Sequence, residues 1–169
     1  MFESFIEWLT GNPEYLGIGI AFTACVESFF VVGIIVPGVA ILFAAAAAGA
    51  AADISAWPLM AWAAAGAICG DTISYFLGRF FGMEARHLGW MQKHQEKWDK
   101  AHDFFVRYGM FAIVAGRFIG LIRPVMPTVA GAAGMPRRVF IATDLLSALA
   151  WAPLYILPGY YGAEWFLAV

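Results

Sequence analysis

The sequence predicts an all-α integral membrane protein, in which two opposed re-entrant helical hairpins and two spanning helices form an inverted repeat. The first reason is composition: 62% of the 169 residues are hydrophobic, 13% are charged, and the mean hydropathy is +0.75. An ordinary soluble domain has about 25% charged residues. Because polar side chains are too few to cover the surface in water, we expect most of that surface to face lipid. The net charge of −2 also argues against a nucleic-acid partner.

Four apolar runs define the expected membrane segments, at residues 15–52, 57–81, 108–135 and 139–157. A spanning helix needs about 20 apolar residues, and the second and fourth runs have that length. The first and third contain glycine and proline near the middle, in Gly33–Pro37 and Gly120–Pro124. Because proline interrupts a helix, we expect each to form two short helices and to return to the side from which it entered. A proline-kinked spanning helix is the alternative.

Two short sequence repeats favour hairpins over kinked spans. The pattern G-[IL]-I-x-P occurs in both broken runs, and YFLGRFFG at residues 75–82 resembles YILPGYYG at residues 155–162. Internal duplication of this kind is common in transporter folds. We therefore expect a single membrane domain over residues 1–169, with repeat one at about 13–82, an amphipathic linker helix at about 84–107, and repeat two at about 108–162.

The placement of cations is consistent with this topology. Seven of the ten Lys and Arg residues lie in segment 86–107 or at positions 137 and 138, whereas the flanks of the first run carry only acids. By the positive-inside rule, segments 86–107 and 137–138 are both cytoplasmic, which requires run 108–135 to return. The linker helix would then lie at the cytoplasmic interface. Its three histidines do not have metal-ligand spacing, so we expect no metal site.

Four ionisable side chains inside the apolar runs are the candidate functional residues: Glu27, Asp71, Arg117 and Arg123. An ionised side chain at the bilayer centre costs about 2.5 to 3.5 kcal/mol even on lenient scales, so such residues need a function or a partner. The structural alternative is that Glu27 and an arginine form a buried pair that only holds the hairpins together.

Arg117 and Arg123 are six residues apart, so they converge only if the chain bends between them. Gly120 and Pro124 permit that bend. Two guanidinium groups at a broken-helix tip are suited to a phosphate or carboxylate anion. We expect Glu27 and Asp71 to exchange protons as the anion comes and goes. Further support is expected from a set of neighbouring residues, with Tyr75 ordering the Asp71 carboxyl: Tyr75, Arg79, Pro37, Gly38 and Pro127.

Several of these residues carry a resemblance to a known family. They are Glu27 followed by Pro37-Gly38, Gly70-Asp71 followed by YFLGR at residues 75–79, and most specifically Arg117-Phe118 through Arg123 and Pro127 to Ala130-Gly131. Over nearly its whole length the chain resembles the DedA family, which shares its domain with the VTT or SNARE-associated Golgi proteins.

The resemblance implies a lipid translocase of the bacterial cytoplasmic membrane. Family members are implicated in moving undecaprenyl phosphate, or phospholipids such as phosphatidylethanolamine, with dependence on proton motive force. The functional residues it implies are Glu27, Arg117 and Arg123. The family commonly has Pro-Gly-Glu or Pro-Gly-Asp, whereas Val39 follows Pro37-Gly38 here. That difference weakens the case for strict proton coupling and shifts weight to Glu27 and Asp71.

We therefore expect a translocase for an anionic phosphate headgroup, with undecaprenyl phosphate recycling as the first candidate. A phosphatidylethanolamine scramblase and a proton-coupled small-ion or drug antiporter are alternatives. The sequence has no P-loop and no Ser-His-Asp order, so we expect neither enzymatic activity nor a cofactor. The expected partners are a membrane lipid and protons, and a homo-oligomer is compatible with the sequence.

Overall fold

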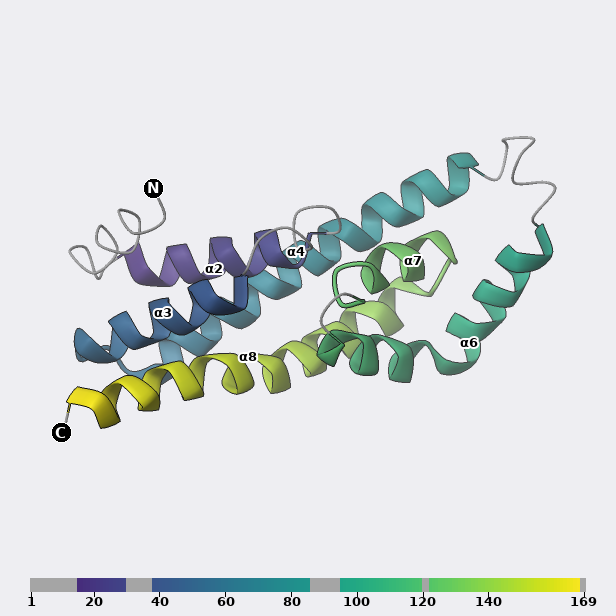
Figure 1. Cartoon of the computed structure of the whole chain (residues 1–169). Coiled ribbons are helices and arrows are strands. Elements are labelled where there is room, and N and C mark those ends of the chain that lie inside the picture. Colours follow the sequence, from purple (N-terminus) through teal and green to yellow (C-terminus); the bar gives the residue numbers. More distant parts are fainter. Residues whose placement is uncertain (1–14, 30–37, 86–94, 120–121, 168–169) are drawn as a thin grey trace.

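A computed structural model describes residues 15–29, 38–85, 95–119 and 122–167. This part of the chain is helical and contains no strand, which confirms the all-α prediction (Figure 1). Its helices are α2 (Leu16–Glu27), α3 (Gly38–Ala51), α4 (Ala56–Ala85), α6 (Gln95–Phe118), α7 (Met126–Ala132) and α8 (Arg137–Leu167).

Both apolar runs that contain central glycine and proline are divided into two helices. In the first run, α2 and α3 lie side by side and run in opposite directions (Figure 1). In the second, α6 ends at Phe118, and turns at residues 122–125 lead into α7, which packs against α6. With 12 and 14 residues, α2 and α3 are about 18 and 21 Å long, shorter than the roughly 30 Å hydrocarbon core. Their re-entrant placement and the inverted repeat stay predictions.

The two long helices are α4, with 30 residues, and α8, with 31. Within the described ranges, one stretch is both long enough and apolar enough to cross a membrane, Arg137–Gly162 of α8. Pro153 and Pro158 lie inside α8 without ending it. The helix α4 has the length, and its expected span across the bilayer stays a prediction.

Helix α6 joins two segments that the sequence analysis treated separately. It continues without interruption from Gln95 to Phe118, past the boundary expected near residue 107. Its first half exposes Asp99, Asp103 and Arg107. Its second half exposes mostly apolar side chains, such as Phe111, and buries Ile113 and Arg117. The remainder of the expected linker, up to residue 94, lies outside the described residues.

Glycines on α4 bring two short helices into direct backbone contact with it. A Cβ atom at Gly66 or Gly70 would collide with backbone carbonyls of α2, at Ala21 and Cys25. About two turns further along α4, a Cβ at Gly78 would collide with the backbone of α7 at Thr128. Small residues serve this role in membrane helices because dispersion contacts between backbones replace the hydrophobic effect. These glycines on α4 therefore act in helix packing.

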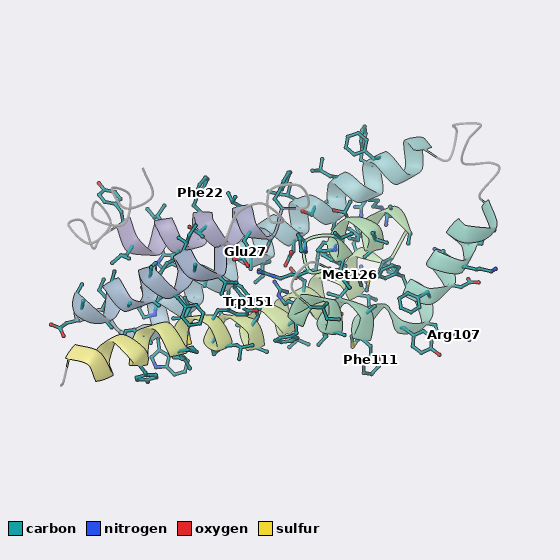
Figure 2. All side chains as sticks on the ribbon, in the orientation of Figure 1. Phe22, Glu27, Arg107, Phe111, Met126 and Trp151 are labelled. Atoms are coloured by element: carbon teal, nitrogen blue, oxygen red, sulfur yellow. The ribbon has the colours of Figure 1, made fainter. Side chains whose placement is uncertain are left out.

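Many large apolar side chains lie on the outside of the bundle, while five charged side chains are buried beside its apolar core. Large apolar side chains such as Phe22, Phe111 and Leu146 are 66 to 76% exposed. In Figure 2, Phe22 and Phe111 point away from the bundle, whereas Glu27 and Trp151 lie between the helices. A soluble monomer rarely exposes so much contiguous apolar surface. This distribution is that of a protein solvated by lipid.

The close contact at Gly78 predicts a stability difference between two glycine-to-alanine variants. We expect Gly78→Ala to destabilise the fold by about 1 to 3 kcal/mol, because the added methyl group overpacks the α4–α7 contact. The matched control is Gly162→Ala on α8, where a Cβ would meet nothing within 4 Å. Alanine should there be neutral or stabilising by roughly 0.5 to 1 kcal/mol. Thermal unfolding of detergent-purified protein measures both, and equal shifts would contradict the packing role.

Candidate functional site

Five charged side chains meet in the middle of the bundle, and each is at most 8% exposed. The acids come from the long helices and from the end of α2, and the arginines come from the second hairpin. The members of this ion-pair cluster are Glu27, Asp71, Asp144, Arg117 and Arg123. Removing a charge from water is unfavourable unless hydrogen bonds and opposite charges replace the water. The contacts within the cluster therefore determine where these side chains lie.

Arg117 connects α6 to both long helices. Its Nη2 donates to Asp71 Oδ2 on α4, and its Nη1 donates to Asp144 Oδ1 on α8, each over 2.6 Å. The same Nη1 also donates to the Ser147 hydroxyl and to the Asp144 carbonyl, at 2.6 and 3.1 Å. Arg117 lies in the last turn of α6, where a cation interacts favourably with the helix dipole. One guanidinium thus holds three helices together.

Arg123 lies in the turn between α6 and α7 and connects the second hairpin to the first. Its Nη1 donates to Glu27 Oε1 at 2.6 Å, and its Nη2 donates to the Ser28 hydroxyl at 3.1 Å. Its guanidinium carbon lies 4.0 Å from the centre of the Trp151 ring, in a cation–π arrangement. The ion pair between Glu27 and Arg123 therefore links the end of α2 to the turn of the opposite hairpin.

The two arginines share one small cavity, as the predicted chain reversal requires. The cavity has a volume of about 10 Å³ and is lined by residues from α4, α6, α7, α8 and the turn before α7: Asp71, Ile113, Arg117, Arg123, Met126, Pro127 and Asp144. That volume is close to the minimum for one water molecule. Each arginine also keeps a buried Nε with no hydrogen-bond partner. The site therefore presents unpaired donors but has no room for a phosphate group in this arrangement.

Tyr75 does not order the Asp71 carboxyl, contrary to the expectation from their spacing. Its hydroxyl donates to the Met135 carbonyl at 2.5 Å, and its ring stacks on Phe140 at 4.2 Å. Arg79 Nη1 donates to the same carbonyl and to the Tyr75 hydroxyl, at 3.3 and 3.2 Å. Although Tyr75 lies four residues after Asp71 on α4, its hydroxyl binds the Met135 carbonyl, which lies in the turn before α8. Tyr75 and Arg79 therefore fix the start of α8.

The remaining expected residues contribute packing around the arginines. Gly38 begins α3, and a Cβ there would lie 2.5 Å from Glu27 Oε2, so only glycine leaves room for that carboxylate. Pro124 and Pro127 are buried in the turn and in the first turn of α7. Val39, which follows Gly38, is 39% exposed. Pro37 and Gly120 lie outside the described residues.

Two residues at the site, Asp144 and Trp151, were not among the predicted site residues. Asp144 is an acid inside the apolar run 139–157, so the rule that selected Asp71 would have selected it as well. Trp151, seven residues after Asp144, is uncharged, and a tryptophan in an apolar helix does not by itself indicate a functional site. Its role depends on the position of Arg123, which only the folded chain reveals.

The family model of the VTT domain matches residues 18–161, a range that includes the whole ion-pair cluster. The chain belongs to the VTT-domain family. The predicted resemblance to DedA proteins is thereby confirmed. Since its relatives include named membrane proteins, and its described exterior is apolar, we describe this VTT-domain chain as a helical membrane protein.

Three relatives from Escherichia coli K12 illustrate the similarity. Inner membrane protein YabI is 32% identical over 154 residues, covering 90% of this chain and 60% of YabI. Inner membrane protein YghB is 34% identical over 125 residues, covering 73% and 57% of the two chains, and protein DedA is 30% identical over 138 residues, covering 80% and 63%. The chain thus spans about 60% of the length of these curated relatives. No solved structure matches it.

The contact between Glu27 and Arg123 predicts a large coupling energy. We expect Glu27→Gln to lower the free energy of unfolding by about 3 to 5 kcal/mol, because it leaves a buried guanidinium without its counter-charge. The double variant Glu27→Gln/Arg123→Gln should recover part of that loss, and Asp103→Asn on the exposed face of α6 should have little effect. Denaturant unfolding is measured for the parent, for each single variant, Glu27→Gln and Arg123→Gln, for the double variant and for the Asp103→Asn control. A double variant whose loss equals the sum of the single losses would contradict direct pairing.

Proposed function

We propose that this VTT-domain protein moves a lipid with an anionic phosphate headgroup across the cytoplasmic membrane of a bacterium. The observation that carries the proposal is the convergence of two buried arginines on one cavity, inside a protein whose exterior is apolar. The first candidate substrate is undecaprenyl phosphate, which the family resemblance implies. The location is supported by relatives that are named inner membrane proteins.

The chemistry of the arginines suits a phosphate group. A guanidinium binds phosphate and carboxylate with the same paired geometry, so a headgroup can replace a carboxylate without leaving the cation unpaired. Arg123 is held by a single acid, Glu27, and by the Ser28 hydroxyl. Glu27 is the last residue of α2, where the helix dipole disfavours a negative charge. We therefore infer that Glu27 competes with the headgroup for Arg123 and takes up a proton when it is displaced.

The hairpins supply the movement in this proposal. Because the cavity holds about 10 Å³, one hairpin must move away from the other before a headgroup can enter. The two hairpins would be re-entrant from opposite faces and would open in turn to each leaflet, while the lipid tail stays in the bilayer. Helices as short as α2 and α3 support such an arrangement, since neither reaches across the hydrocarbon core alone.

We propose transport without covalent chemistry, cofactor or metal. The buried polar groups of the cluster are acids, arginines and serines, and the described residues offer no group of three metal-ligating side chains. An antiporter for small ions or drugs could use the same charges. The two arginines favour the lipid phosphate, because buried guanidinium groups attract an anion and repel an inorganic cation.

Reconstitution in liposomes tests the proposed function with Arg123→Lys. Lysine keeps the charge but loses the paired donors, and hydrogen bonds to charged groups contribute about 1.5 to 3 kcal/mol. We therefore expect the rate of movement of labelled polyprenyl phosphate between leaflets to fall about tenfold or more. The matched control is Arg107→Lys on the exposed face of α6, which should transport like the parent (Figure 2).

The unfolding temperature of each variant shows whether it is folded, and the assay also separates the alternatives. Equal transport by a folded Arg123→Lys variant and by the parent would refute the headgroup assignment. If labelled phosphatidylethanolamine moves and polyprenyl phosphate does not, the protein is a phospholipid scramblase. Proton release on addition of a cation, without movement of either lipid, would instead identify an antiporter.

A further inference from the structure

The ion-pair cluster contains three carboxyl groups and only two guanidinium groups. With all five ionised, it would carry one excess negative charge at a site where no member is more than 8% exposed. The sequence of residues 30–37 and 120–121 contains no charged residue that could balance it. An unbalanced charge in the bilayer interior is strongly unfavourable, so the excess requires a counter-charge.

The excess is located at Arg117 and not at Arg123. Arg123 contacts one acid, whereas Arg117 contacts both Asp71 and Asp144 through different nitrogens, each at 2.6 Å. Both carboxyl groups bind the same guanidinium group, so they lie near each other. Each retains a buried oxygen without a partner, Oδ1 of Asp71 and Oδ2 of Asp144. A single proton on one of them would let it donate to the other and would cancel the excess charge.

The other groups near the aspartates do not provide that counter-charge. Cys25, whose carbonyl lies against Gly70 next to Asp71, carries no positive charge, and neither does Tyr155 on α8. Arg123, the other nearby cation, is paired with Glu27. Within the described part of the chain, no set of side chains could hold a metal ion. A proton is therefore favoured over a metal cation.

We propose that Asp71 and Asp144 share one proton, with Arg117 holding both carboxyl groups, and that Asp144 is thereby a proton-binding residue of the site. What the proton does rests on the proposed function. A phosphate headgroup that draws Arg117 away leaves the two acids without their cation, so they bind a second proton from water. When the headgroup leaves, Arg117 returns and that proton is released. Anion and proton would then cross in the same step.

Infrared difference spectroscopy of the purified full chain in nanodiscs, exchanged between H2O and D2O, detects the shared proton. We expect the carbonyl band of a protonated, buried carboxylic acid in the parent at neutral pH. The band should be lost in Asp144→Asn and in Asp71→Asn, because either change balances the charge. It should persist in Glu27→Gln/Arg123→Gln, which removes one acid and one cation together and leaves the two aspartates facing Arg117.

Stability provides a second, independent measurement. Asparagine has the shape of a protonated aspartate, so we expect Asp144→Asn to unfold at the temperature of the parent, whereas Arg117→Gln should unfold at a clearly lower one. A parent without the band, a band that survives in Asp144→Asn, or a band lost in the Glu27/Arg123 double variant would each overturn the proposal. No lipid substrate is needed, so a band in a protein that moves no lipid would refute the proposed function alone.

Discussion

Arg117 and Arg123 occupy positions that water cannot solvate, and the arrangement of the bundle follows from the acids that reach them. Between them they contact α2, α4 and α8. In lipid, helices gain no hydrophobic free energy by associating, so polar contacts and close backbone packing determine how they associate. The guanidinium groups supply the polar contacts. The glycines of α4 allow the close backbone packing, at Gly66, Gly70, Gly78 and Gly82. Both are needed, because an acid reaches an arginine only if the helix backbones lie close together.

This combination leaves the centre of the protein less fixed than an apolar core would be. A packed apolar core has one low-energy arrangement, and it loses contacts when it opens. A buried arginine can instead be satisfied by any anion that supplies the same paired hydrogen bonds, a carboxylate or a phosphate. The link between the hairpins consists of such a pair, Glu27 with Arg123. Close backbone packing thus holds the short helices on α4, whereas an ion pair links the ends of the two hairpins.

Much of this could be predicted from the sequence, because lipid makes local rules strict. The breaks at glycine and proline, the packing glycines, and the burial of Glu27, Asp71, Arg117 and Arg123 each follow from one short segment and one physical rule. The acid that pairs with each arginine cannot be predicted from a short segment in this way. Whether Arg117 meets Asp71, Asp144 or both depends on how α4 and α8 are placed relative to α6, which no local pattern encodes. The same holds for Tyr75, whose partner lies sixty residues away.

The two halves of the chain have corresponding helix contacts but different charges. By contacts the halves are alike: α2 and α6 pack on the long helix that follows their own hairpin, α4 and α8, whereas α3 and α7 pack on the long helix of the other half. An inverted repeat would produce this exchange. The charges are not alike, since both arginines belong to the second hairpin and its counterpart offers Glu27. Unequal charges on the two hairpins suit the proposed transport, in which one hairpin would bind the anion and the other would compete for its cations.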